Sequence, residues 1–86
     1  MAEAANQQEF EALLKKAENG RSVVDFYATW CPPCKRIGPY IEQKCKAEGV
    51  QLIKVDVDKN GTTASKYGIK SMPTFKVIDK TGKVIA

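Results

Sequence analysis

Histidine is absent from this chain of 86 residues, and cysteine occurs only three times. A zinc site commonly needs four cysteine or histidine ligands, so a zinc site built by one chain lacks its usual ligands. An iron–sulfur cluster also takes four cysteines and would have to be shared between two chains. We therefore expect no metal, and we keep a metal site only as the alternative to a redox role for the cysteines.

Long apolar runs are missing as well. No stretch approaches the ~20 apolar residues that span a bilayer. Residues 1–10 have neither the basic start nor the apolar run of a secretory signal. We therefore expect no membrane association and a cytoplasmic, reducing location. In such a compartment, a close pair of cysteines is more often catalytic or metal-binding than structural.

Positive charge is in excess, but it is not concentrated. The chain has 14 Lys and Arg residues against 10 Asp and Glu residues, which gives a net charge of +4. The longest basic runs are two pairs, Lys15–Lys16 and Lys35–Arg36. Because nucleic-acid-binding proteins usually gather their basic residues on one face, we expect no nucleic-acid partner.

The length suits one small domain, so we expect residues 1–86 to form a single domain. Asn6, with Glu9 three residues later, has the pattern of a capping box at the start of a helix, and Gly20 is a natural stop. Apolar spacing and turn residues predict further helices over 31–47 and 61–67, strands over 22–27, 50–57 and 74–78, and a hairpin into 83–86. This order predicts an α/β fold in which helices cover both faces of a small mixed sheet.

Cys31 and Cys34 are three residues apart at the expected start of a helix. Side chains at this spacing lie on the same side of a helix, close enough for a small adjustment to form a disulfide. The partial positive charge and free N–H groups of a helix N-terminus favour a thiolate. Because Pro32 and Pro33 have no N–H group, we expect the Cys34 N–H to donate to the Cys31 sulfur.

Four segments together resemble the thioredoxin family. Residues 24–35, VDFYATWCPPCK, are similar to its active-site signature, VDFxAxWCGPCK, and residues 71–75, SMPTF, are similar to its cis-proline segment. The segments VDVD at 55–58 and KYGI at 66–69 also match, and the resemblance covers about residues 10–82. It implies a thioredoxin-like fold and a thiol–disulfide oxidoreductase that reduces protein disulfides, with no cofactor beyond its own redox-active disulfide.

The resemblance implies a role for each matching residue. Cys31 would be the exposed nucleophile that forms a mixed disulfide with the substrate, and Cys34 the more buried thiol that resolves it. Trp30 would shape the surface that faces the partner, the alternative being an ordinary core aromatic. If the bond before Pro73 is cis, the backbone of Met72 can pair with an extended substrate as an added strand does.

Asp25 stands in an apolar strand, where a carboxylate is costly unless it is neutral or paired. Lys54 lies in the next apolar strand and matches the family's lysine partner for this aspartate. Asp25 would exchange a proton with Cys34, or the Asp25–Lys54 pair would be a buried ion pair without a catalytic part. Cys45 continues an apolar helical stripe and is most simply a packing residue, with regulatory oxidation or dimerisation as the alternative.

The chain departs from the family pattern in two respects. Pro32 stands where the family usually has glycine, and the Cys-Pro-Pro-Cys motif also occurs in tryparedoxins. The expected electron donor is an NADPH-dependent thioredoxin reductase. The alternatives are a tryparedoxin-like carrier supplied by another dithiol and a truncated, non-catalytic binding module.

The two ends are the second departure. Residues 1–5 are short and alanine-rich, so we expect no strand there, and we expect residues 1–86 to lack the closing helix of the family. One face of the sheet should then be partly uncovered. We expect the chain either to self-associate, as a homodimer or a domain swap, or to be only marginally stable as a monomer. The side chains expected to be exposed are those of Phe75, Val77, Ile78, Val84 and Ile85.

Overall fold

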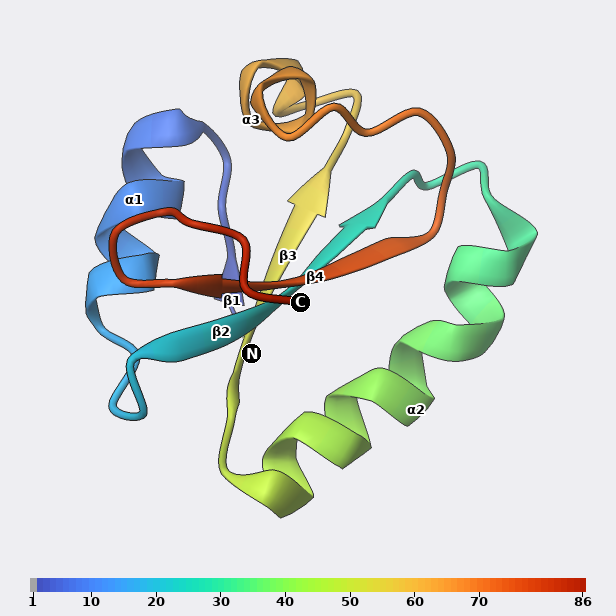
Figure 1. Cartoon of the computed structure of the whole chain (residues 1–86). Coiled ribbons are helices and arrows are strands. Elements are labelled where there is room, and N and C mark those ends of the chain that lie inside the picture. Colours follow the sequence, from blue (N-terminus) through green and yellow to red (C-terminus); the bar gives the residue numbers. More distant parts are fainter. Residues whose placement is uncertain (1) are drawn as a thin grey trace.

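The computed structural model describes residues 2–86 as one four-stranded sheet flanked by helices (Figure 1). The strands and helices are β1 (Ala2–Glu3), α1 (Gln7–Lys15), β2 (Arg21–Tyr27), α2 (Pro32–Glu48), β3 (Gln51–Asp56), α3 (Gly61–Lys66) and β4 (Thr74–Asp79). The strand order is β1-β3-β2-β4, with β3 parallel to β1 and β2, and β4 antiparallel to β2. In Figure 1, α1 and α3 lie on one side of the sheet and α2 lies on the other. The expected mixed sheet with helices on both faces is therefore confirmed.

The first helix begins as its capping residues predict. The Glu9 N–H donates to the Asn6 side-chain oxygen at 2.8 Å, and the Glu9 carboxylate accepts from the Ala5 N–H at 3.0 Å. The helix ends at Lys15, earlier than expected, because the Ala17 N–H bonds to the Leu14 carbonyl in a tight turn. Ala17 is buried in the turn that follows the helix.

Alternation along β2 separates two different faces of the sheet. Val24 and Phe26 are fully buried in the apolar core on the side of α1 and α3. The buried members of this core are Ala4, Phe10, Leu14, Val24, Phe26, Ile53, Val55, Ala64 and Ile78. Successive strand residues point to opposite faces, so Asp25 and Tyr27 lie on the side of α2.

The expectation that no strand precedes the first helix was wrong. Ala2 pairs with Ile53 and Glu3 with Lys54 at the edge of β3. The Ala4 N–H continues this ladder to the Lys54 carbonyl at 3.0 Å, and the Ala4 side chain is buried. The strand forms from backbone pairing and a buried alanine, so its low intrinsic strand propensity is overridden by tertiary context.

The chain after β4 returns as a hairpin, and Ile78 forms a bridge to Val84. Ile78 was expected to be exposed, but it is fully buried because it points to the side of α1 and α3. Phe75 and Val77 are half-buried, whereas Val84 and Ile85 are 41% and 51% exposed. The uncovered apolar surface is therefore smaller than the sequence predicted.

Candidate functional site

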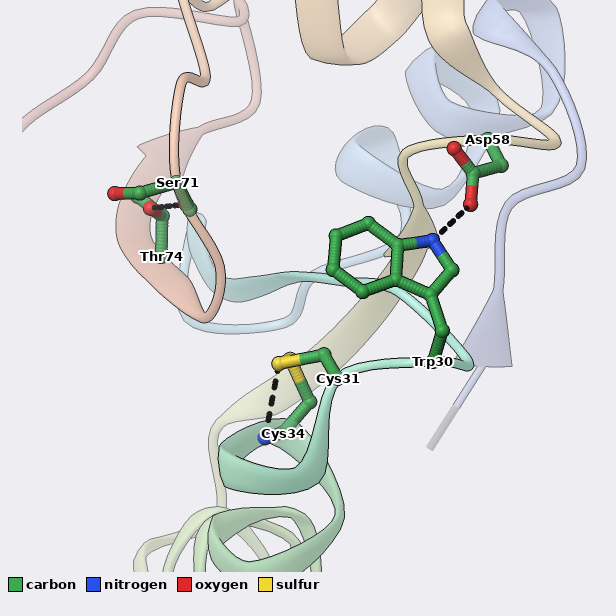
Figure 2. Close-up of a disulfide and its surroundings, with 6 residues drawn as sticks. All are labelled: Trp30, Cys31, Cys34, Asp58, Ser71 and Thr74. Carbon is green, nitrogen blue, oxygen red and sulfur yellow. Dashed lines mark hydrogen bonds between the residues drawn. A yellow bond between two sulfur atoms is a disulfide. The ribbon is translucent and has the colours of Figure 1, made fainter.

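Cys31 is the N-cap of α2, and it forms a disulfide with Cys34 in the first turn of that helix. Their Cα atoms are 5.3 Å apart. Pro32 and Pro33 begin the helix, where the first N–H groups have no intrahelical partner in any case. The Cys34 N–H donates to the Cys31 sulfur at 3.2 Å, as expected from the two prolines (Figure 2).

Both sulfur-bearing residues are buried in the disulfide form. Cys31 is 4% exposed and Cys34 is 7% exposed, so the expected contrast between an exposed Cys31 and a more buried Cys34 is wrong for this state. The disulfide draws both side chains into one apolar cluster with Ala28, against which Tyr27 and Met72 pack.

The loop that carries Met72 and Pro73 lies next to this cluster. The Met72–Pro73 peptide bond is cis, as the resemblance implied, and both residues are half-buried. Figure 2 shows the Trp30 indole on one side of the disulfide and the loop with Ser71 and Thr74 on the other. The Thr74 hydroxyl donates to the Ser71 carbonyl and closes the loop.

Trp30 is 63% exposed, which excludes a place in the core. Its indole N–H donates to the Asp58 carboxylate at 2.8 Å (Figure 2). Sequence reasoning missed Asp58. The signal was present, since Asp58 follows β3 and Trp30 follows the parallel strand β2, and the carboxyl ends of parallel strands meet at one edge.

Asp25 lies on the same side of the sheet as the disulfide and is 3% exposed. Its Oδ1 atom is buried and has no hydrogen-bond partner in the described chain. Burial raises the pKa of this carboxyl to about 6, against the lowering effect of the Lys54 ammonium.

The ion pair between Asp25 and Lys54, which was the alternative to proton exchange, is not formed. The two residues are direct neighbours across β2 and β3, but the Lys54 Nζ atom lies 3.9 Å from the Glu42 carboxylate on α2. The ammonium also sits 4.6 Å from the centre of the Tyr27 ring. The Glu42 carboxylate and the Tyr27 ring are thus the partners of the Lys54 ammonium, at a site more exposed than the buried Asp25 carboxyl. Sequence reasoning identified neither partner.

A pocket of about 260 Å³ connects Asp25 and Lys54 with Cys34 of the disulfide. Its lining residues are Asp25, Tyr27, Ala28, Thr29, Cys34, Lys35 and Lys54. A water molecule takes about 30 Å³ of liquid volume, so the pocket has room for water between the Asp25 carboxyl and Cys34. The Asp25 carboxyl and Cys34 therefore line one pocket that has room for water.

Cys45 is a buried free cysteine on α2, and burial raises the pKa of its thiol. This position fits a packing residue, as expected. Within residues 2–86, no group of three or more cysteine, aspartate or glutamate side chains is placed to hold a metal ion. Over the same part of the chain, no helix combines the length and apolar character needed to cross a membrane.

The thioredoxin family model matches residues 1–86. The chain is 44% identical over 80 residues to Thioredoxin-1 of Caenorhabditis elegans, which covers 92% of this chain and 69% of that protein. It is 41% identical over 83 residues to thioredoxin of Bacillus subtilis, with 94% and 76% of the two chains covered.

Solved structures agree with these matches. The X-ray structure of Fasciola hepatica thioredoxin superposes with a TM-score of 0.90 at 39% identity, over 100% of this chain and 83% of that one. Plasmodium falciparum thioredoxin gives a TM-score of 0.89 at 38% identity, over 100% and 82%. With its Cys31–Cys34 pair at disulfide distance, the chain belongs to the thioredoxin family and is a thiol–disulfide oxidoreductase that reduces protein disulfides.

Proposed function

We propose that Cys31 is the nucleophile of this protein-disulfide reductase and that Cys34 is the resolving thiol. This assignment is supported by the position of Cys31 as N-cap of α2, with the Cys34 N–H directed at its sulfur. This donor and the helix N-terminus stabilise negative charge on Cys31 and not on Cys34, whose sulfur lies within the helix.

The reaction begins from the dithiol form. The Cys31 thiolate attacks one sulfur of a substrate disulfide, the substrate S–S bond breaks, and the released sulfur leaves as a thiolate that takes a proton. Cys34 then loses its proton and attacks the Cys31 sulfur. The mixed disulfide breaks, the second substrate thiol is released, and two electrons have passed from the protein to the substrate as the Cys31–Cys34 bond forms.

Asp25 accepts the Cys34 proton in this second step. The support is the shared pocket of about 260 Å³ and a carboxyl pKa of about 6, which leaves Asp25 mostly ionised yet able to take a proton near neutral pH. Lys54 lines the same pocket, and its ammonium lowers the pKa of Asp25 and so favours the ionised carboxylate. It acts through electrostatics and not as a direct ion-pair partner.

Trp30, Met72 and Pro73 form the substrate-facing surface around the disulfide. The exposed indole and the Met72 loop lie on opposite sides of the two sulfurs (Figure 2). An extended substrate segment placed between them would pair with the backbone of Met72 as an added strand. Disulfide-containing proteins are therefore the proposed partners, and the chain's own disulfide is its redox group.

Electrons come from an NADPH-dependent thioredoxin reductase, as family membership supports. Pro32 is the feature that favours the second candidate, a tryparedoxin-like carrier supplied by a different dithiol. Residues 1–86 act as a single domain in the cytoplasm in either case. Self-association through Phe75, Val77 and the exposed hairpin stays a prediction, which sedimentation across a dilution series tests.

A turbidity assay of protein-disulfide reduction tests the function. The chain should accelerate reduction when a small dithiol supplies electrons, and also when NADPH and thioredoxin reductase replace the dithiol. Activity with the dithiol alone would favour the tryparedoxin-like carrier. No activity with either donor, in a chain shown to be folded by circular dichroism, would contradict the proposal.

A further inference from the structure

One row of side chains across the sheet carries an unusual concentration of charge. Glu3 on β1 is in register with Lys54 on β3, and Lys54 is in register with Asp25 on β2. The next residue in the row, Phe75 on β4, is uncharged. Glu42 reaches the same row from α2. Three carboxylates and one ammonium therefore lie on the face of the sheet that holds the disulfide.

The Lys54 ammonium does not lie midway among these carboxylates. It lies 3.9 Å from the Glu42 carboxylate and 4.6 Å from the centre of the Tyr27 ring. The Tyr27 hydroxyl donates to the Glu3 carboxylate, and this hydrogen bond restrains the ring against which the ammonium lies. The ammonium is thus held at the edge of the cluster, and the Asp25 Oδ1 atom remains buried without a partner.

We infer that Glu42 is a positioning residue for the proton on Asp25. By holding the Lys54 ammonium against the Tyr27 ring, it keeps Asp25 unpaired and able to take a proton beside Cys34. This inference rests on the role of Asp25 proposed above and extends it to a residue on α2 that touches neither the disulfide nor the substrate.

Electrostatics give the direction of the effect. The Glu42 carboxylate raises the pKa of Asp25, as Glu3 also does, whereas Lys54 lowers it. Removing the charge of Glu42 takes away one like charge, and it also frees the ammonium to move toward Asp25. Both changes lower the pKa of Asp25. The other charged group that lines the pocket, Lys35 on α2, is unchanged by this substitution.

The test is a pH titration of the Asp25 carboxyl carbon by NMR in the oxidised chain, where no cysteine of the pair titrates. Glu42→Gln should lower the midpoint by about 0.5 pH unit, as expected for one like charge near a protein surface. The matched control is Glu48→Gln on the same helix, which removes an exposed ion pair to Lys44. This control should leave the midpoint unchanged. Glu42→Asp keeps the negative charge, so its midpoint should return most of the way to the parent value.

Turnover measurements separate this inference from the proposed function. In Glu42→Gln, the limb of the pH–rate profile that Asp25 controls should move to lower pH by a similar amount. An unmoved or raised midpoint in Glu42→Gln overturns the inference, even if Asp25→Asn slows turnover and the proposed base stands. A lowered midpoint together with unchanged turnover in Asp25→Asn supports the assignment of Glu42 and contradicts the proposed base.

Discussion

The two faces of the sheet differ in almost every physical respect. On the side of α1 and α3, Phe10, Phe26 and Ile53 are fully buried in a core without charged side chains. On the side of α2, the same strands place Asp25 and Lys54 beside a pocket that reaches Cys34. One face therefore supplies most of the folding free energy, and the other carries the buried charge for which we propose a role in proton transfer.

The largest effect should follow from a cavity on the apolar face. Phe10→Ala removes a fully buried ring that contacts Tyr67 edge to face, and it should lower the free energy of unfolding by about 3–5 kcal/mol. Tyr40→Ala on α2, where the side chain is 61% exposed, should lower it by about 0.5 kcal/mol or less. Urea unfolding of both variants measures the difference.

Turnover of the folded fraction should remain near the parent value in Phe10→Ala, since the ring lies on the face opposite the disulfide. Comparable losses of stability in Phe10→Ala and Tyr40→Ala would break the contrast between the two faces.

A change on the charged face should have the opposite sign for stability. Asp25→Asn removes a buried carboxylate whose folded-state pKa is about 6, against an ordinary value of 3.8. The folded parent holds this proton more tightly than the unfolded chain, so its stability falls as pH rises from about 4 to above 6. At pH 7 the variant should be more stable than the parent by about 1–2 kcal/mol, and this gap should close below pH 4.

The same substitution should slow protein-disulfide reduction at least ~10-fold near pH 7, because it removes the proposed proton acceptor of Cys34. Urea unfolding at several pH values and the turbidity assay measure the two effects. If the free energy of unfolding changed with pH in the same way in the parent and the variant, the Asp25 carboxyl would not have a raised pKa in the folded chain.

A smaller effect is expected at the edge where β2 and β3 end. Asp58→Asn replaces the charged acceptor of the Trp30 indole N–H and weakens the restraint on an exposed ring. Rates with a protein disulfide should fall about two- to fivefold, which corresponds to no more than about 1 kcal/mol. Rates with a small-molecule disulfide should not change. Equal losses with both substrates would place Asp58 in the chemistry and not in the partner-facing surface.

Local signals predicted much of the fold and the reacting pair. Asn6 and Glu9 marked the start of α1, and two prolines between the cysteines left the Cys34 N–H as the donor to Cys31. These signals act over a few residues, so sequence carries them directly.

The errors concern contacts between distant segments. The pairing of β1 with β3, the burial of Ile78 and the capture of Lys54 by Glu42 each depend on which element lies opposite. Spacing along the chain does not specify such contacts. The exposure of Cys31 was also misjudged, because this residue packs in one apolar cluster with Ala28 and Cys34.

Trapping of the mixed disulfide tests whether Cys31 is the nucleophile and Cys34 the resolving thiol. Cys34→Ser lacks the proposed resolving thiol, so a protein disulfide should remain covalently attached to the variant at Cys31. Peptide mass spectrometry after non-reducing electrophoresis identifies the attached residue, and Cys31→Ser serves as the matched control. We expect attachment at Cys31 in Cys34→Ser and no adduct in Cys31→Ser. Attachment at Cys45, or a stable adduct at Cys34 in Cys31→Ser, would contradict it.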